Sequence, residues 1–138
     1  MQLVILASGS GKRLHHLTKL KPKCFVKVGN KKIIDYLKIN FKYFKEVIIV
    51  AGYKKKLISR EFKNYTIVDN KNYKNTNMVH SLFCAKKYIK EDIIVCYSDI
   101  IFSPKILTKM IRKKNTHMPI NQSWFKTWSL RMKKKKIF

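Results

Sequence analysis

A glycine-rich segment near the N-terminus carries the residues best suited to bind a chain of phosphates. Residues 6–14 read Leu-Ala-Ser-Gly-Ser-Gly-Lys-Arg-Leu, and a Pro-Lys pair follows at positions 22–23. Because Gly9 and Gly11 lack a side chain, a ligand can approach the main chain closely, and backbone N–H groups of such a loop form a concavity that binds anions. Three side chains add positive charge: Lys12, Arg13 and Lys23. The pattern predicts a triphosphate site.

Two common phosphate loops do not fit this segment. A Walker A loop needs a glycine five positions before its Gly-Lys pair and Ser or Thr after it, but Leu6 and Arg13 occupy those positions. A dinucleotide-binding loop needs a third glycine three residues after Gly11, where Leu14 stands. The sequence therefore excludes both classes.

A lone carboxylate beside a second apolar segment is the other candidate for chemistry. Residues 93–97 read Ile-Ile-Val-Cys-Tyr, and Asp99 is followed at once by Ile-Ile-Phe. A carboxylate in such surroundings is costly unless it meets a cation or several hydrogen-bond donors. Since Mg2+ prefers one or two carboxylates together with phosphate oxygens and water, the sequence favours Asp99 as a magnesium ligand. The alternative is an aspartate that caps a turn.

Short apolar runs that alternate with helical patterns must position these residues. Strand-like runs lie at 3–6, 47–51, 65–68 and 92–97, and apolar stripes at helical spacing lie at 33–44, 55–62, 78–89 and 104–111. Such alternation predicts parallel strands with crossover helices and places binding sites at the carboxyl ends of the strands. Gly52 ends the second strand, so it either contacts a nucleotide through its backbone or forms an ordinary turn.

The spacing of the glycine loop, its arginine and the distant Pro-Lys resembles the signature of nucleotidyltransferases that join an NTP to a phosphorylated sugar or alcohol. The family pattern is Leu-Ala-Ala-Gly-x-Gly-x-Arg-Leu, then about eight residues, then Pro-Lys, and here Ser8 replaces the usual second alanine. The segment Asn77-Met-Val-His-Ser81-Leu resembles the Asn-x-x-x-Ser-Leu segment of the choline-phosphate cytidylyltransferase-like branch. Asn77 is equally well explained as the N-cap of the helix that follows it.

The resemblance implies a Rossmann-like, three-layer α/β sandwich with a mostly parallel sheet, incomplete at its C-terminus. It implies that Arg13 binds the leaving β- and γ-phosphates, that Lys23 lies near the α-phosphate or the acceptor, and that Asp99 holds Mg2+. The residues that it places around the nucleotide are Leu6, Ala7, Ser8, Gly9, Gly11, Lys12, Gly52 and Asn77.

The activity implied is transfer of a nucleotidyl group, with CTP favoured, to phosphocholine or a similar small phosphate, with release of pyrophosphate. A sugar-1-phosphate acceptor is the alternative. Members of the family are considerably longer and usually have a second metal-binding aspartate, which no residue here matches. We therefore expect a nucleotide-binding domain at 1–114, an irregular or partly disordered basic tail at 115–138, and a truncated chain whose activity is weak or absent.

The charge of the chain suggests a different class of function. The sequence has 32 Lys and Arg against 7 Asp and Glu, a net charge of +25, which is typical of proteins that bind nucleic acid or anionic membranes. Lysine is spread along the whole chain, as drift toward AT-rich codons would also produce. We expect no specific nucleic acid and no membrane as partner, and keep a basic nucleic-acid-binding protein as the non-enzymatic alternative.

The cysteines indicate a reducing compartment. Cys24, Cys84 and Cys96 are odd in number and lack the spacing of a zinc site, so buried free thiols are expected. The apolar N-terminal run is too short for a signal peptide or a membrane span. These features together predict a cytoplasmic protein.

Overall fold

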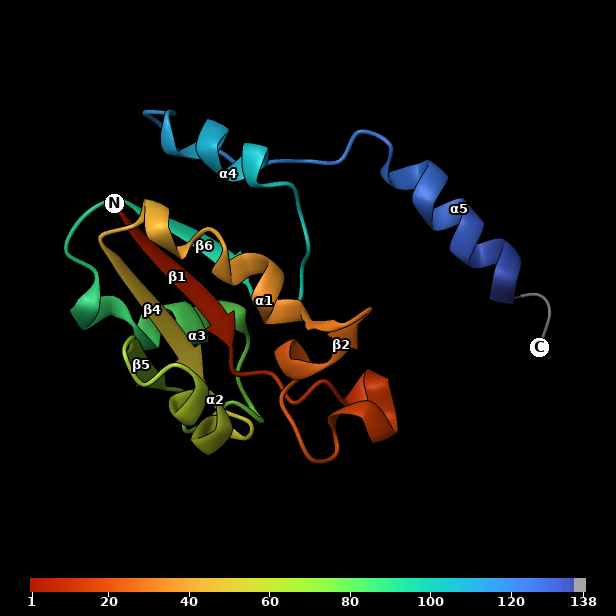
Figure 1. The fold of residues 1–138 in the computed structure, drawn as a ribbon, viewed down its shortest axis with the longest axis horizontal. Coiled ribbons are helices and arrows are strands. Elements are labelled where there is room, and N and C mark those ends of the chain that lie inside the picture. Colours follow the sequence, from red (N-terminus) through yellow and green to blue (C-terminus); the bar gives the residue numbers. More distant parts are fainter. Residues whose placement is uncertain (136–138) are drawn as a thin grey trace.

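Four parallel strands form the centre of the molecule, which we describe from a computed structural model of residues 1–135 (Figure 1). The strands are β1 (Gln2–Ala7), β4 (Glu46–Ala51), β5 (Thr66–Asp69) and β6 (Ile93–Tyr97), in the order β5-β4-β1-β6. Gln2 is in register with Glu46 on one side and with Ile93 on the other. The predicted parallel sheet and its alternation with helices are confirmed.

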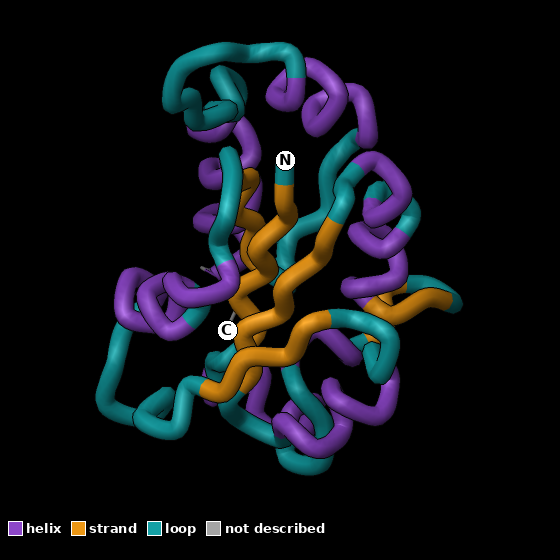
Figure 2. The backbone as a smooth tube through the Cα atoms, turned by 90° about the vertical axis from the view of Figure 1, so that its left-hand side faces the viewer, coloured by secondary structure: helices purple, strands orange, loops and turns teal. Residues whose placement is uncertain are grey.

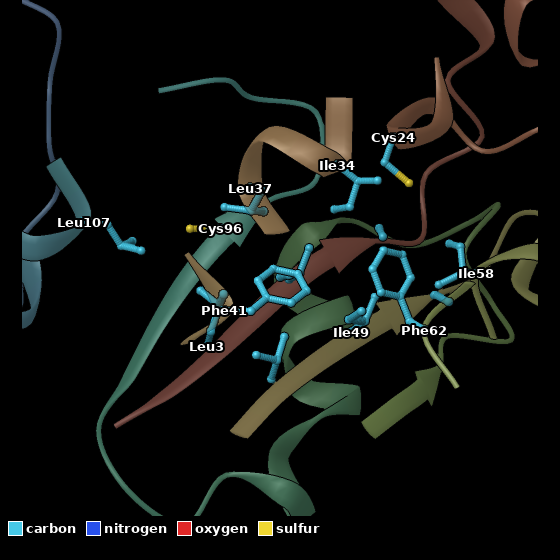
Figure 3. Close-up of a cluster of buried hydrophobic side chains, with 14 residues drawn as sticks. Leu3, Cys24, Ile34, Leu37, Phe41, Ile49, Ile58, Phe62, Cys96 and Leu107 are labelled. Carbon is cyan, nitrogen blue, oxygen red and sulfur yellow. The ribbon is translucent and has the colours of Figure 1, made fainter. Parts of the chain in front are cut away.

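Strands β1 and β4 are apolar from their second residue onward because both faces of the sheet are covered there. On one face Leu3 and Ile5 pack with helices α1 (Ile33–Lys38), α2 (Lys55–Glu61) and α4 (Pro104–Ile111), as Figure 3 shows for the buried side chains. On the other face Val4, Ile48 and Val50 pack against α3 (Met78–Cys84). Figure 2 shows helices on both sides of the strands. The chain thus forms the expected three-layer α/β sandwich.

Two helices are shorter than the periodicity predicted. The stripe at 33–44 forms α1 and a separate 3-10 turn, η3 (Phe41–Tyr43), because the backbone switches at Asn40 to tighter bonds: Asn40 N donates to Leu37 O and Tyr43 N donates to Asn40 O. The stripe at 78–89 likewise forms α3 and the 3-10 turn η4 (Lys86–Tyr88). Apolar spacing of three and four is common to both kinds of helix and cannot locate such a switch.

The segment between β1 and α1 holds the remaining short elements. After the glycine loop come two 3-10 segments, η1 (Lys12–Thr18) and η2 (Lys23–Phe25), and a small antiparallel pair, β2 (Lys27–Val28) and β3 (Lys31–Lys32). This segment lies beyond the carboxyl end of β1 in Figure 1. It carries the predicted phosphate-binding cations.

The C-terminal part differs from the irregular tail that we predicted for 115–138. A helix, α5 (Trp124–Lys135), extends away from the sheet (Figure 1), and Trp124 and Trp128 on it are exposed. Its start is satisfied by Asn121, whose carbonyl accepts from Trp124 N and whose side chain accepts from Ser123 N. The segment lacks Gly and Pro after position 119, so it contains neither of the two strongest helix breakers. Residues 136–138 of the predicted tail lie outside the described part of the chain.

None of the helices described within residues 1–135 is both long enough and apolar enough to span a membrane.

Candidate functional site

The candidate site lies where the carboxyl ends of the strands meet. At these ends, three backbone hydrogen bonds join each loop to a neighbouring strand or loop: Ser98 N donates to Leu6 O (3.2 Å), Tyr53 N to Ser8 O (3.0 Å) and Asn70 N to Ala51 O (2.8 Å). The loops that follow β1, β4, β5 and β6 therefore form one continuous edge. Gly9 and Gly52 both belong to this edge, as the alternation of strands and helices predicted.

The glycine loop has the backbone shape that its sequence requires. Gly11 has a φ of 66°, in the left-handed region that favours glycine, and it caps η1. A Cβ on Gly11 would come within 3.0 Å of the Thr18 side chain and 3.1 Å of Lys23 Cβ, so the loop and Lys23 are in close contact. Gly9 is exposed, and a Cβ there would meet nothing within 4 Å. The space beside Gly9 is therefore open to a ligand.

Lys23 and Asp99, which are far apart in the sequence, meet at this edge. Lys23 Nζ donates to Asp99 Oδ2, and both side chains are about two-thirds covered. Lys23 is placed by Pro22 at the start of η2, and Asp99 follows β6 by two residues. The lone carboxylate thus meets a cation, as its apolar surroundings required.

The two other predicted cations follow the glycine loop directly. Lys12 and Arg13 are exposed at the start of η1, immediately after Gly11. Because both side chains are exposed to solvent, their positive charges can attract an anion toward the loop. The structure thus groups the glycine loop with three cations and one carboxylate.

Asp99 was predicted as a magnesium ligand. Its surroundings are compatible with that role, which stays a prediction. No group of three or more His, Cys, Asp or Glu side chains suitable for a metal ion occurs in the described part of the chain. Mg2+ bound to a nucleotide needs only one or two carboxylates because phosphate oxygens and water complete its shell. Asp99 could supply one such ligand if Lys23 released it. The donor set therefore fits a nucleotide-bound Mg2+ and not a metal held by protein alone.

Gly52 is required by packing. A Cβ at this position would lie 2.6 Å from Cβ of Tyr73 and 2.9 Å from the carbonyl oxygen of Ser8, so a larger residue would force the loops apart. Tyr73 thereby covers the end of β4. The predicted contact of Gly52 with a nucleotide stays a prediction.

Asn77 is the N-cap of α3. Its Oδ1 accepts a hydrogen bond from His80 N at 3.1 Å. The amide is exposed, so a ligand could also reach it. The capping explanation is thus confirmed, while the predicted nucleotide contact is untested.

Three further residues shape the site, and the sequence assigned no role to two of them, Asn70 and Ser81. Tyr53 bridges two loops, since its N–H donates to Ser8 O and its hydroxyl donates to Thr18 O and Lys19 O, each at 2.9 Å. Asn70 and Ser81 are buried polar residues beneath the loop 70–77. A polar residue directly after an apolar strand, as Asn70 is, was the one available signal.

The cysteine nearest the site is not a nucleophile. Burial raises the pKa of the Cys24 thiol to about 12, although a hydrogen bond with Ser98 works in the opposite direction. Burial likewise raises the pKa of Cys96 to about 11. Both thiols are free and stay protonated at neutral pH, as the sequence indicated.

Comparisons with known proteins agree with this arrangement. Residues 3–121 match the MobA-like NTP transferase domain. The chain is 38% identical over 143 aligned positions to a CTP:phosphoglutamine cytidylyltransferase of Campylobacter jejuni, covering 95% of this chain and 56% of that protein. It is 30% identical over 112 positions to a UTP–glucose-1-phosphate uridylyltransferase of Haloferax volcanii, covering 77% of this chain and 46% of the other.

A solved structure shares the fold. The CTP:phosphocholine cytidylyltransferase of Streptococcus pneumoniae superimposes with a TM-score of 0.61 and 28% identity, covering 71% of this chain and 44% of that one. The chain therefore spans about half the length of the proteins that it matches.

Proposed function

Because the chain belongs to the MobA-like NTP transferase family, we propose that it transfers a nucleotidyl group from an NTP to a small phosphorylated acceptor and releases pyrophosphate. One observation carries the proposal: Lys23, which packs against Gly11 of the glycine loop, meets Asp99 from the end of β6. A cation, a carboxylate and an open glycine loop in one place suit a nucleoside triphosphate. The relatives that act on CTP favour CTP as the donor.

In this proposal the reaction is a direct displacement at the α-phosphorus. An oxygen of the acceptor phosphate forms a bond to the α-phosphorus while the bond to the β-bridging oxygen breaks, and pyrophosphate leaves with that electron pair. The protein positions the two phosphates and stabilises the developing charge, with no covalent intermediate. Arg13 would bind the β- and γ-phosphates, since its planar guanidinium matches two phosphate oxygens at once.

Lys23 would change partners when the nucleotide binds. In the free protein its ammonium group donates to Asp99, and a phosphate oxygen offers it an acceptor of higher charge. Movement of Lys23 to the α-phosphate would release Asp99 to hold Mg2+. Magnesium at that position would neutralise phosphate charge during the transfer.

The acceptor is proposed to be phosphocholine or another small phosphate. The similar proteins act on phosphoglutamine and phosphocholine, and these compounds share a terminal phosphoryl group with little else in common. A sugar 1-phosphate is the alternative, since the Haloferax relative acts on glucose 1-phosphate.

A second candidate, nucleic-acid binding, is favoured by one feature of the surface. Helix α5 exposes Trp124, Phe125 and Trp128 in a chain of net charge +25. Aromatic side chains in a basic setting can stack on bases, with strong dependence on salt. This function leaves the contact of Lys23 with Asp99 without a role.

Thermal unfolding with Mg2+ and each of CTP, UTP, dTTP, ATP and GTP tests the main proposal. A ligand at a hundred times its dissociation constant stabilises the folded state by about 2.7 kcal/mol, so modest affinity is measurable. We expect the largest shift with CTP and its loss in Asp99→Asn, whereas Asp92→Asn, an exposed carboxylate outside the site, should retain it. A melting temperature indifferent to every nucleotide would overturn the proposal.

Release of pyrophosphate from CTP, with phosphocholine and phosphoglutamine as acceptors, then tests turnover. Arg13→Lys keeps the charge but loses the planar fork, so we expect activity to fall by about tenfold or more. Arg60→Lys on α2 is the matched control and should leave activity unchanged. Equal rates in the wild type and Arg13→Lys would remove Arg13 from the proposed site.

A further inference from the structure

A buried chain of side-chain hydrogen bonds runs from the end of β1 to the end of β5. Ser8 Oγ lies 2.8 Å from Ser81 Oγ, and Asn70 Nδ2 donates to Ser81 Oγ at 3.0 Å and to Thr76 Oγ1 at 3.0 Å. Ser8, Asn70 and Ser81 are each less than 9% exposed. Buried polar groups of this kind are costly unless they are paired, so the chain is a built feature of the site.

The other contacts of Ser81 fix the direction of the bond to Ser8. Ser81 Oγ donates its single proton to Asn77 O at 3.2 Å. All of these bonds form together only when Ser81 Oγ accepts from Asn70 Nδ2 and from Ser8 Oγ, and we therefore take Ser8 as the donor. Both protons of the Asn70 amide are used, and its Oδ1 accepts from Asn72 N at 3.1 Å.

This chain of bonds reaches across a strand. In the sheet β4 lies between β1 and β5, so the bonds between Ser8, Ser81 and Asn70 bridge over its end. There Tyr73, from the loop 70–77, covers Gly52 and faces Tyr53 at 6.2 Å between ring centroids. The loop 70–77 is therefore held against the glycine loop by hydrogen bonds below and by two aromatic rings above.

The loop that is held in this way carries groups that suit a nucleoside. Its sequence is Asn-Lys-Asn-Tyr-Lys-Asn-Thr-Asn, and side-chain amides offer both donors and acceptors to the edge of a base. The cations Lys12, Arg13 and Lys23 belong to other elements, η1 and η2. The two ends of a nucleotide would thus meet different parts of the chain.

We propose that Ser8, Asn70 and Ser81 are positioning residues that hold the loop 70–77 where it receives the nucleoside of the NTP, without acting on its phosphates. The inference rests on the proposed function. It gives a role to Ser8, which stands where related enzymes usually have alanine, because alanine could not donate to Ser81.

The direction of the bonds predicts an unusual order of effects. Ser81→Ala leaves the Ser8 hydroxyl and one Asn70 N–H as buried donors without an acceptor, which is the costly case. Ser8→Ala removes only a donor and leaves no group unpaired. The double variant Ser8→Ala/Ser81→Ala leaves one unpaired donor where Ser81→Ala leaves two, so it should be less impaired than Ser81→Ala alone.

The test compares binding of CTP with binding of pyrophosphate by calorimetry. For Ser81→Ala we expect the dissociation constant of CTP to rise about tenfold, the effect of an orphaned buried donor, while that of pyrophosphate stays within about twofold. Thr76→Val should also raise the dissociation constant of CTP more than that of pyrophosphate, by a smaller factor. It replaces Ser81→Ala in the test if that variant does not fold. Ser59→Ala on α2 is the matched serine control. Equal effects on CTP and pyrophosphate, or a double variant as impaired as Ser81→Ala, would overturn the proposal.

Amide hydrogen exchange without ligand separates this inference from the proposed function. In Ser81→Ala the Asn72 amide, which donates to Asn70, should exchange about tenfold faster, and the double variant should restore part of its protection. If the wild-type chain binds neither CTP nor pyrophosphate, the proposed function fails and exchange alone decides. Equal exchange of Asn72 in the wild type and Ser81→Ala then overturns the positioning role.

Discussion

Strands β4 and β6 lie on opposite sides of β1 and have similar sequences in different surroundings. We call the β4 side and the β6 side the two flanks of the sheet. Strand β4 reads Val-Ile-Ile-Val-Ala over residues 47–51, and every one of these side chains is buried. Strand β6 reads Ile-Ile-Val-Cys-Tyr, yet Val95 and Tyr97 are each 42% exposed. Within the described residues β6 pairs with β1 alone, whereas β4 has β1 and β5 as neighbours.

The exposed flank borders a large cavity. It measures about 1160 Å3 and is lined by β6, by α4 and by the segment 113–123. Apolar composition alone therefore did not determine burial; the number of neighbouring elements did. The candidate site lies across the carboxyl ends of both flanks.

We expect the largest contrast between the two flanks when valine is replaced by alanine in each strand and the free energy of unfolding is compared. Val50→Ala removes fully buried methyl groups from β4, so we expect a loss of about 2 kcal/mol in the free energy of unfolding. Val95→Ala in β6 removes half-exposed groups and should cost under about 0.5 kcal/mol. Urea titration of both variants measures the difference. Equal costs would show that the β6 flank is covered in solution.

High pH should also lower the free energy of unfolding, through the buried thiol of Cys24. The folded state holds the pKa of Cys24 at about 12, against an ordinary value of 9.0, so the thiol ionises first in the unfolded chain. The stability that the neutral thiol contributes is complete below pH 9 and is lost as the pH rises from 9 toward 12. The loss is at most about 1.4 kcal/mol per pH unit.

Unfolding of the wild type and Cys24→Ala between pH 8 and 10.5 measures this loss, because lysine titration is common to both proteins. The wild type should lose stability more steeply above pH 9. Parallel curves would mean that Cys24 is accessible to solvent.

The smallest effect is expected at a partly exposed ion pair of the packed flank. Lys55 Nζ lies 2.8 Å from Asp69 Oδ2, with 41% of the lysine side chain exposed. Such pairs contribute under about 1 kcal/mol and are screened by salt. Asp69→Asn should therefore lower the free energy of unfolding slightly at low salt and not measurably at 1 M NaCl. A loss that persists at 1 M NaCl would assign the effect to packing.

The sequence predicted the features that depend on local pattern. Apolar runs located all four strands of the parallel sheet, and the spacing of Gly11, Arg13 and Lys23 located the candidate site. It could not predict that Asn40 would interrupt a helix, since apolar spacing continues through it. Nor could it find the bonds among Ser8, Asn70 and Ser81, because these residues come together only after β4 has been inserted between β1 and β5.

The central place of β1 has a consequence for how the chain acquires its structure. Residue 2 pairs with residue 46 on one side and with residue 93 on the other, so the first strand to be synthesised waits longest for its second neighbour. Closing loops of that length is slow compared with forming local helices. During synthesis the segment Leu3–Ile5 would stay partly uncovered until most of the chain has emerged, a period in which it is open to chaperones and to aggregation.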